Sequence, residues 1–406
     1  MVSVIGLGYI GLPTSLMLAS HNVDVTGVDL NKELVATLNA GHTTFKEDGL
    51  DALYADALAH GIKFTTQYQA SEMYIVAVAT PYDPETKKID PAYVVAAVKN
   101  VLRVAPKGAI IVIESTISPS TIDRYIRPVI EESGAIIGND IHLAHAPERI
   151  IPGNMVHELI HNSRTIGADD PAIGEKVKQI YSSFCQGNIV VTTIRVAEMT
   201  KVVENTYRDI NIAFANELAK ICHQANMDVY EVIRIANMHP RVNILQPGPG
   251  VGGHCIAVDP WFLVGDFPVE AKLIRQAREI NDGMPIYVLN RIDEIMRENG
   301  IQDYSDVGIY GLTYKEDVDD TRESPALQLL QKAPSLFVER VKLYDPMLKR
   351  KIFENQYKDF DEFLSDVKFC VILTGHSHIK DKYANISNKV ILDTRHIFPD
   401  CDVYGL

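Results

Sequence analysis

One cysteine, Cys255, lies in a stretch of backbone that has almost no side chains. Residues 247–255 read PGPGVGGHC and contain four glycines and two prolines, a composition that neither a regular helix nor a central strand accommodates. We therefore predict a shaped loop whose amide groups approach a ligand closely and which presents the thiol as a nucleophile. A carboxylate, Asp259, follows four residues later. The alternative is a flexible surface turn around an incidental buried cysteine.

A second pair of polar residues, Lys201 and Asn205, has helical spacing. The two are separated by four positions in a long helical pattern, which places an ammonium group and an amide on the same face, one turn apart. Such groups can stabilise an oxyanion or supply positive charge beside a thiolate. The alternative is an ordinary solvated face on which Glu204 and Arg208 form an ion pair.

The start of the chain combines a glycine signature with the elements that it requires. The strand-like run Val2–Ile5 leads into GLGYIG, in which Gly6, Gly8 and Gly11 form a GxGxxG pattern, and the helical segment Pro13–Ala19 follows. In this context the first glycine makes the turn, the second admits a pyrophosphate, and the third lets helix and strand pack. Amides at the start of the helix attract phosphate. The pattern predicts a dinucleotide site.

The nature of the dinucleotide follows from Asp29, at the end of the predicted second strand, Val23–Val28. Asp29 lies 18 positions after Gly11, where a carboxylate accepts hydrogen bonds from the adenosine ribose hydroxyls. A 2′-phosphate would face this charge, and two like charges ~4 Å apart repel by about 4 kcal/mol at an effective dielectric constant of ~20. Because no arginine adjoins Asp29, we predict NAD rather than NADP as the cofactor.

Two alternating patterns of strands and helices surround one long helix. The pattern from Val196 to Ala225 contains no proline or glycine and predicts a helix of about 45 Å, at ~1.5 Å per residue, which connects two domains and lends its side to a subunit interface. Before it, the predicted elements are strands Met73–Val78, Ala109–Glu114, Ile141–Ala146 and Ile189–Thr192 and helices Ala92–Leu102 and Ile173–Phe184. After it, they are strands Val307–Leu312, Val338–Tyr344, Lys368–Leu373 and Lys389–Asp393 and a helix capped by Ser324 with Pro325 at its first position.

The predicted fold class is therefore α/β with three parts. Residues 1–193 form an N-terminal Rossmann domain with a doubly wound parallel sheet. Residues 194–300 form a central helical connector that includes the cysteine loop and takes part in dimerisation. Residues 301–406 form a second, Rossmann-like α/β domain.

The bulk composition excludes several classes of protein. The 406 residues exceed what one core supports, and 46% hydrophobic with 23% charged residues is typical of a globular protein without the ~20-residue apolar run of a membrane span. A net charge of −14 argues against nucleic acid as a partner. Five widely spaced cysteines predict neither disulfides nor a metal site, and the close pair His376 and His378 is interpreted as loop residues. The strand-like start at Val2 leaves no room for a signal peptide, which predicts a cytoplasmic protein.

Taken together, these features resemble the nucleotide-sugar 6-dehydrogenase family, which includes UDP-glucose and GDP-mannose dehydrogenases. Besides the glycine signature and the cysteine loop, the resemblance rests on EST at 114–116, PER at 147–149 and TRESP at 321–325, and it covers the whole chain. It implies NAD as cofactor, a UDP sugar as substrate, and a homodimer. The implied cofactor-binding residues are Gly6, Gly8, Tyr9, Ile10, Gly11, Asp29, Thr80 and Thr116.

The resemblance also implies the reaction, a four-electron oxidation in which two NAD molecules convert the C6 alcohol of a hexose into a carboxylate. An aldehyde loses hydride only after a nucleophile has added, so Cys255 would form a thiohemiacetal and then a thioester that water releases. Lys201 and Asn205 would stabilise the alkoxide and the oxyanion, and Glu148 is one candidate for the hydrolytic base. The implied catalytic residues are Thr116, Glu148, Lys201, Asn205, Cys255 and Asp259.

For the sugar nucleotide, the resemblance points to Lys315 and Arg322 as partners of the diphosphate. Without it, they are explained equally well as surface cations in an aspartate-rich loop. Arg241 would reach the site of the neighbouring subunit, which is why a homodimer is implied. The implied substrate-binding residues are Arg149, Lys201, Asn205, Arg208, Arg241, Asn243, Gly250, Gly253, Tyr314, Lys315 and Arg322.

Within the family, the run His239–Gln246 and the residue His254 resemble the branch that oxidises UDP-linked acetamido hexoses, because UDP-glucose dehydrogenases usually carry serine in place of His254. The sequence leaves the C2 epimer open, and UDP-glucose stays an alternative. Two other classes remain: a non-catalytic sensor of NAD or a sugar nucleotide, and a one-step dehydrogenase of a small hydroxy acid, which leaves the cysteine loop unexplained.

Overall fold

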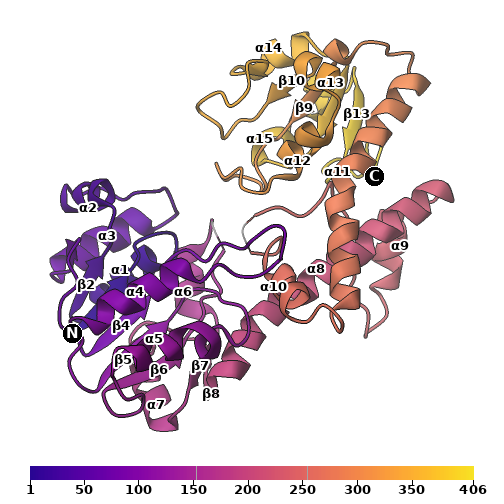
Figure 1. The fold of residues 1–406 in the computed structure, drawn as a ribbon. Coiled ribbons are helices and arrows are strands. Elements are labelled where there is room, and N and C mark those ends of the chain that lie inside the picture. The colour runs from indigo at the N-terminus through magenta and orange to yellow at the C-terminus, as the bar shows by residue number, and fades with distance from the viewer. Residues whose placement is uncertain (152, 254) are drawn as a thin grey trace. The chain divides into compact units, whose positions relative to one another are not determined.

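The chain forms two compact units, Met1–Glu204 and Asn205–Leu406, in a computed structural model that describes residues 1–151, 153–253 and 255–406 (Figure 1). The boundary between the units falls inside one helix, α8 (Ile194–Gln224). His254, on which part of the acetamido-branch prediction rests, lies outside the described residues. The three-part division at residues 193 and 300 stays a prediction. In the described part of the chain, no helix is long and apolar enough to cross a membrane.

The N-terminal unit is built around an eight-stranded sheet with the strand order β3-β2-β1-β4-β5-β6-β7-β8. The strands from β3 to β6 repeat the 3-2-1-4-5-6 order of a dinucleotide-binding fold, which confirms the predicted Rossmann domain. β1, β4 and β5 are buried along their whole length, as strands covered on both faces must be. The strands are β1 (Val2–Ile5), β2 (Val25–Val28), β3 (Lys63–Thr65), β4 (Met73–Val76), β5 (Ala109–Ile113), β6 (Ile141–His145), β7 (Arg164–Ala168) and β8 (Ile189–Thr192).

Apolar faces of the helices cover this sheet. Leu12 and Leu16 of the first helix share one core with Val4 and Ile75 of the strands, which fixes the glycine turn between β1 and that helix. The helices of this unit before α8 are α1 (Gly11–Ser20), α2 (Lys32–Asn39), α3 (Leu50–Ala59), α4 (Ala92–Leu102), a π-helical turn (Ile122–Ile126), α5 (Arg127–Glu132), α6 (Met155–His161) and α7 (Pro171–Tyr181).

The sheet is not wholly parallel, which corrects the prediction. β7, a strand that the sequence pattern missed, pairs antiparallel with β6 and parallel with β8. Only residues 146–163 connect β6 to β7, and the 7-residue helix α6 is about 10 Å long at ~1.5 Å per residue. The chain therefore stays at the edge where β6 ends, and β7 starts there. As a result Arg164, the first residue of β7, meets residues that follow β5 and β6.

The predicted long helix is confirmed as α8, which has 31 residues. The C-terminal unit holds residues 205–224 of α8 and a parallel five-stranded sheet with the order β11-β10-β9-β12-β13. Its strands are β9 (Val307–Tyr310), β10 (Lys342–Tyr344), β11 (Gln356–Tyr357), β12 (Phe369–Ile372) and β13 (Val390–Asp393). Its other helices are α9 (Val229–Ala236), α10 (Asp259–Asp266), α11 (Lys272–Glu298), a 3₁₀ turn (Tyr304–Asp306), α12 (Pro325–Lys332), α13 (Ser335–Arg340), α14 (Phe360–Ser365), α15 (Ser377–Lys380) and α16 (Tyr383–Ile386).

Three local predictions need correction in this unit. The predicted strand Val338–Tyr344 is wrong for its first three residues, which belong to α13, because Phe337 and Val341 are buried four positions apart, a helical spacing. Ser324 stands at the N-cap of α12 as predicted, but its side chain makes no capping hydrogen bond. His378 lies in the short helix α15 rather than in a loop.

Candidate active site

The three glycines of the N-terminal signature meet three different constraints. Gly6 has a φ of +90°, and a Cβ there would lie 2.7 Å from the carbonyl oxygen of Ala77. A Cβ on Gly11 would lie 1.8 Å from the carbonyl oxygen of Gly6, whereas one on Gly8 would meet nothing within 4 Å. The first and third glycines thus allow close backbone packing, and the second leaves open space beside the start of α1, as a pyrophosphate requires.

Asp29 is tied to the same turn. Its Oδ2 accepts the Leu7 N–H at 2.8 Å and its Oδ1 accepts the Asn31 N–H at 2.8 Å. The carboxylate is therefore held beside the glycine turn, where the adenosine ribose of a dinucleotide lies in this fold.

The other predicted cofactor residues lie within the glycine turn or after two of the central strands. Ile10 is the N-cap of α1, and Tyr9 lies against the ring of Phe45, with centroids 4.4 Å apart. Thr80 and Thr116 come after β4 and β5. Because ligands of open α/β sheets bind at the carboxyl ends of strands, near the point where the strand order reverses, both threonines lie at the edge where a nicotinamide would be expected. Their roles stay predictions.

A buried ion-pair cluster lies at this carboxyl edge. Arg164 contacts the carboxylates of Glu148 and, at 3.6 Å, Glu114, and all three side chains are at most 3% exposed. The Arg164 guanidinium also stacks over the ring of Tyr181, 4.5 Å from its centroid, and the Tyr181 hydroxyl donates to Glu114 at 2.9 Å. Glu148, a predicted base, is therefore held rigidly. Sequence reasoning missed Arg164, because its partners depend on the antiparallel β7.

Two carboxylates share one arginine in this cluster, so the single positive charge of Arg164 cannot neutralise two negative charges. Burial raises the pKa of Glu114 from its ordinary 4.5 to about 7, although Arg164 opposes the shift. A proton therefore resides on Glu114 over much of the range below neutrality. Burial likewise lowers the pKa of the neighbouring His145 to about 4, which keeps this imidazole neutral.

Arg149, a predicted substrate residue, is engaged within the N-terminal unit. Its guanidinium donates to the Ser163 carbonyl at 2.7 Å and to the Thr165 hydroxyl at 2.9 Å, and it lies 2.6 Å from Glu204. Glu204 thus has Arg149 as an ion-pair partner. Contact of Arg149 with substrate stays a prediction.

The polar pair on α8 is buried, which rules out the solvated-face alternative. Lys201 is 6% exposed and Asn205 is 7% exposed. The Asn205 amide donates to Oδ2 of Asp259, the first residue of α10, at 2.6 Å. One turn further along α8, Asp209 accepts from Arg278 at 2.6 Å and from Asn281 at 2.8 Å. Burial raises the pKa of Asp209, against the effect of Arg278. These bonds fasten α8 to α10 and α11.

The cysteine loop presents its thiol at the surface. Cys255 is exposed, so the alternative of a buried cysteine is wrong. A Cβ on Gly252 would lie 2.6 Å from the Glu323 carbonyl oxygen, and one on Gly253 would lie 2.8 Å from the Tyr314 ring. Gly253 also donates its N–H to the Arg322 carbonyl at 3.0 Å. The glycines therefore let the loop pack directly against the turn that carries Tyr314.

Amides of α8 hold the preceding part of the loop. Asn211 bridges the Asn243 carbonyl and the Leu245 N–H, both at 2.9 Å, and Asn216 accepts the Gly248 N–H at 2.9 Å. Asn243 was among the predicted substrate residues, whereas Asn211 and Asn216 were not predicted. Their spacing of five positions is about 140° around α8, at ~3.6 residues per turn, so no shared face of the helix singles them out in the sequence.

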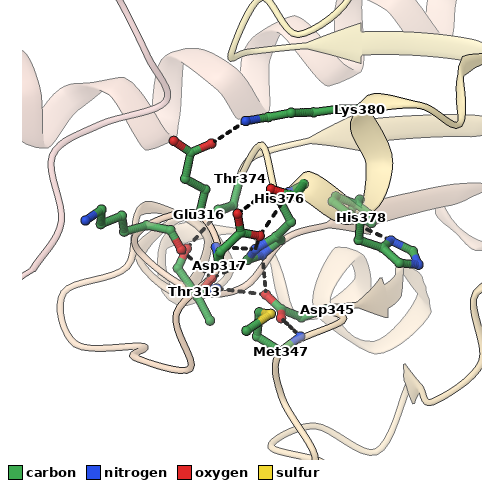
Figure 2. Close-up of polar contacts among 12 residues, drawn as sticks. Thr313, Glu316, Asp317, Asp345, Met347, Thr374, His376, His378 and Lys380 are labelled. Atoms are coloured by element: carbon green, nitrogen blue, oxygen red, sulfur yellow. Dashed lines mark hydrogen bonds and ion pairs between the residues drawn. The ribbon is translucent and has the colours of Figure 1, made fainter. Parts of the chain in front are cut away.

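A cavity of about 520 Å³ opens at the carboxyl ends of β9, β12 and β13, the expected place for a ligand in an open α/β sheet. Predicted Tyr314 and Lys315 line it. Figure 2 shows Lys380 reaching toward Glu316 beside it, and their charged groups are 2.9 Å apart. The lining residues that the sequence analysis missed are Glu316, Thr374, Gly375, Lys380, Arg395, His396 and Ile397.

The remaining predicted substrate residues differ in setting. Gly250 is buried with a φ of +136°, and a Cβ there would lie 3.3 Å from Pro325. Arg208, Arg241 and Asn243 are exposed. Arg322 is exposed and bonded to Asp320 at 2.6 Å. That pairing fits the surface-cation alternative as well as a substrate role, so the role of Arg322 stays a prediction.

Three protein-family models match the chain in sequence order. Each belongs to the UDP-glucose/GDP-mannose dehydrogenase family: the NAD binding domain matches residues 1–185, the central domain residues 195–283, and the UDP binding domain residues 308–400. The chain therefore belongs to this family, and its cofactor is NAD. The predicted resemblance is confirmed.

Relatives and solved structures agree over the full length. The chain is 41% identical over 406 residues to a UDP-N-acetyl-D-mannosamine dehydrogenase of Methanococcus aeolicus, covering 97% of this chain and 91% of the relative. It is 39% identical over 409 residues to an NDP-N-acetyl-D-galactosaminuronic acid dehydrogenase of Ralstonia nicotianae, covering 97% and 95%. The structure of a UDP-N-acetyl-mannosamine dehydrogenase from Staphylococcus aureus matches with a TM-score of 0.88 and 43% identity, covering 100% and 97%. The chain is thus an NAD-dependent UDP-sugar dehydrogenase.

Proposed function

We propose that this enzyme oxidises the C6 hydroxyl of UDP-N-acetylmannosamine to a carboxylate, with two NAD per sugar and Cys255 as the nucleophile. The observation that carries the proposal is the exposed thiol of Cys255 on a loop whose glycines pack against Tyr314. Tyr314 also lines the cavity of the UDP binding domain. Full-length similarity to the UDP-N-acetyl-D-mannosamine dehydrogenase of Methanococcus aeolicus supports the choice of sugar.

The reaction proceeds in two oxidations and one hydrolysis. NAD, when bound, accepts the hydride from C6 in each oxidation. In the first, the hydroxyl loses a proton and a hydride to give the aldehyde. The Cys255 thiolate then adds to C6, and loss of the second hydride converts the thiohemiacetal into a thioester. Water attacks the thioester, the C–S bond breaks, and the thiol is released with the uronate.

The supporting residues act on charge and on protons. Lys201 and Asn205 stabilise negative charge on the C6 oxygen, and loss of such a donor typically costs ~10²–10³-fold in rate. The bond from Asn205 to Asp259 fixes the orientation of the amide. Asp259 holds a water or relays a proton. Glu148, held by Arg164, takes a proton from the attacking water, and Thr116 would contact the nicotinamide of bound NAD.

The experiment is an NADH-release assay with UDP-N-acetylmannosamine, UDP-N-acetylglucosamine, UDP-N-acetylgalactosamine, UDP-glucose and GDP-mannose. We expect the highest kcat/KM for the first and two NADH per sugar consumed, because a pocket built to bind an amide leaves polar groups unpaired when the amide is missing. The Ralstonia nicotianae relative favours a galacto-configured acetamido sugar as the second candidate. Preference for UDP-glucose would refute the choice of sugar, and one NADH per sugar would refute the thioester route.

We also propose a cytoplasmic homodimer. The surface of α8 carries exposed apolar residues at Val203, Tyr207, Phe214 and Ile221, the most exposed being Tyr207 at 63%. Their spacing of four, seven and seven positions places them along one stripe of the helix. An exposed apolar stripe of this kind is typical of a contact with another protein chain. In the proposed homodimer, Arg241 would act in the partner's site.

A further inference from the structure

The turn that carries Tyr314 and Lys315 is held by a buried polar cluster behind the cavity wall. The turn follows β9, and its first residue, Gly311, has a φ of +90°. The N–H groups of Leu312 and Thr313 donate to Oδ2 of Asp345 at 2.6 and 3.0 Å. Asp345 follows β10 and its side chain is 0% exposed. Bonds from His376 and from backbone N–H groups outweigh burial and hold the pKa of Asp345 below its ordinary value.

His376 joins both ends of this turn. Its Nδ1 accepts the Asp317 N–H at 2.9 Å, so the ring carries its proton on Nε2. There it faces the Thr313 hydroxyl at 3.2 Å and Asp345 Oδ2 at 3.3 Å. The imidazole is fully buried, and it bonds on each side of Lys315 in the sequence. Figure 2 shows Asp317, His376 and Asp345 converging from three segments.

Further hydrogen bonds hold residues 313–317, which we call the arc, around the His376 ring. The Thr374 hydroxyl donates to the Thr313 carbonyl at 2.7 Å. Asp317 accepts the N–H and the hydroxyl of Ser377, at 2.9 and 2.5 Å, and its φ of +57° lies in the left-handed region. A strained aspartate and a buried histidine–aspartate pair both cost free energy relative to apolar packing, so the stability of the fold does not explain them. Their common effect is to fix the turn that lines the cavity.

We propose that His376 is a positioning residue, which holds the arc 313–317 so that Tyr314 and Lys315 meet the diphosphate of the sugar nucleotide. The proposal rests on the proposed UDP-sugar function. The hydrogen bonds made by the two ring nitrogens of His376 can be removed one at a time. His376→Asn keeps an acceptor near the place of Nδ1 for Asp317, and His376→Gln keeps a donor near the place of Nε2 for Asp345.

His378 supplies the matched control. It lies in α15, the short helix whose N-cap is His376, and apart from the cluster in Figure 2. Its ring nitrogens meet the Tyr310 hydroxyl at 3.1 Å and Lys382 at 2.8 Å. His378→Asn therefore removes comparable bonds from α15 without touching the arc.

The test is calorimetric titration of the full-length protein with UDP, followed by steady-state kinetics with the sugar nucleotide. We expect each His376 variant to bind UDP about fivefold more weakly than wild type, the effect of one lost hydrogen bond. KM for the sugar nucleotide should rise by a similar factor, with KM for NAD and kcat unchanged. His378→Asn should match wild type.

The outcomes separate the inference from the function on which it rests. Wild type that does not bind UDP would refute the cavity as the UDP site, and the inference with it. Unchanged UDP affinity in both His376 variants, beside a wild type that binds, would refute the positioning role alone. Equal weakening in His378→Asn would also refute it, because the cause would then be general loosening of α15.

Discussion

Replacing Glu114 with glutamine should stabilise the protein above pH 7, although it removes a carboxylate 3.6 Å from Arg164. Burial raises the pKa of Glu114 from its ordinary 4.5 to about 7. Between these values the unfolded chain has lost the proton and the folded chain has kept it. The folded state therefore binds more protons, and the free energy of unfolding falls as pH rises.

The magnitude follows from the size of the shift. One pKa unit corresponds to about 1.4 kcal/mol, so the full loss between pH 4.5 and 7 is about 3 kcal/mol. Glutamine is neutral at every pH, and its amide oxygen can still accept the Tyr181 hydroxyl that now bonds Glu114. Arg164 keeps Glu148 as its partner. The variant should thus lack this pH-dependent loss.

Urea unfolding followed by circular dichroism at pH 5 and pH 8 measures the effect. At pH 5 the variant and wild type should differ by less than about 1 kcal/mol, and at pH 8 the variant should be more stable by about 3 kcal/mol, or about 6–12 °C in Tm for a unit of this size. The exposed Glu132→Gln serves as control. A variant that is less stable than wild type at pH 8 would show that Glu114 is ionised and that its attraction to Arg164 dominates.

Three further predictions concern catalysis, cofactor choice and assembly. Cys255→Ser should lower kcat at least about 10³-fold while UDP and NAD affinities stay within a few fold of wild type; near-normal turnover in steady-state assays would rule out the covalent route. Asp29→Ala should narrow the preference for NAD over NADP at least about tenfold, measured as the ratio of kcat/KM values, and an unchanged ratio would contradict it. Tyr207→Asp with Phe214→Asp should convert a dimer into monomers in analytical ultracentrifugation, whereas Leu58→Asp, also exposed, should not; a dimer that persists would place the interface elsewhere.

The sequence by itself determined the elements that local patterns encode. The glycine signature between β1 and α1 could be recognised because local backbone geometry demands glycine there: Gly6 has a φ of +90°, and a Cβ on Gly11 would meet the carbonyl oxygen of Gly6. The helix α8 was predictable because its spacing of apolar residues and its lack of proline and glycine are properties of one continuous segment. The cysteine loop was recognisable for a similar reason, since its composition excludes regular structure.

The tertiary structure decided which distant residues meet. β7 runs antiparallel to β6 because the short connection between them stays at the edge of the sheet where β6 ends. Only that direction brings Arg164 to Glu148. The first three residues of Val338–Tyr344 are helical because Phe337 and Val341 are buried in a core formed by distant parts of the chain. His376 reads in the sequence as one of a pair of loop histidines, because its partners Asp345 and Asp317 lie 31 and 59 positions away. Hydrogen-bond partners at such separations are chosen by topology, and a single sequence carries no local signal of that choice.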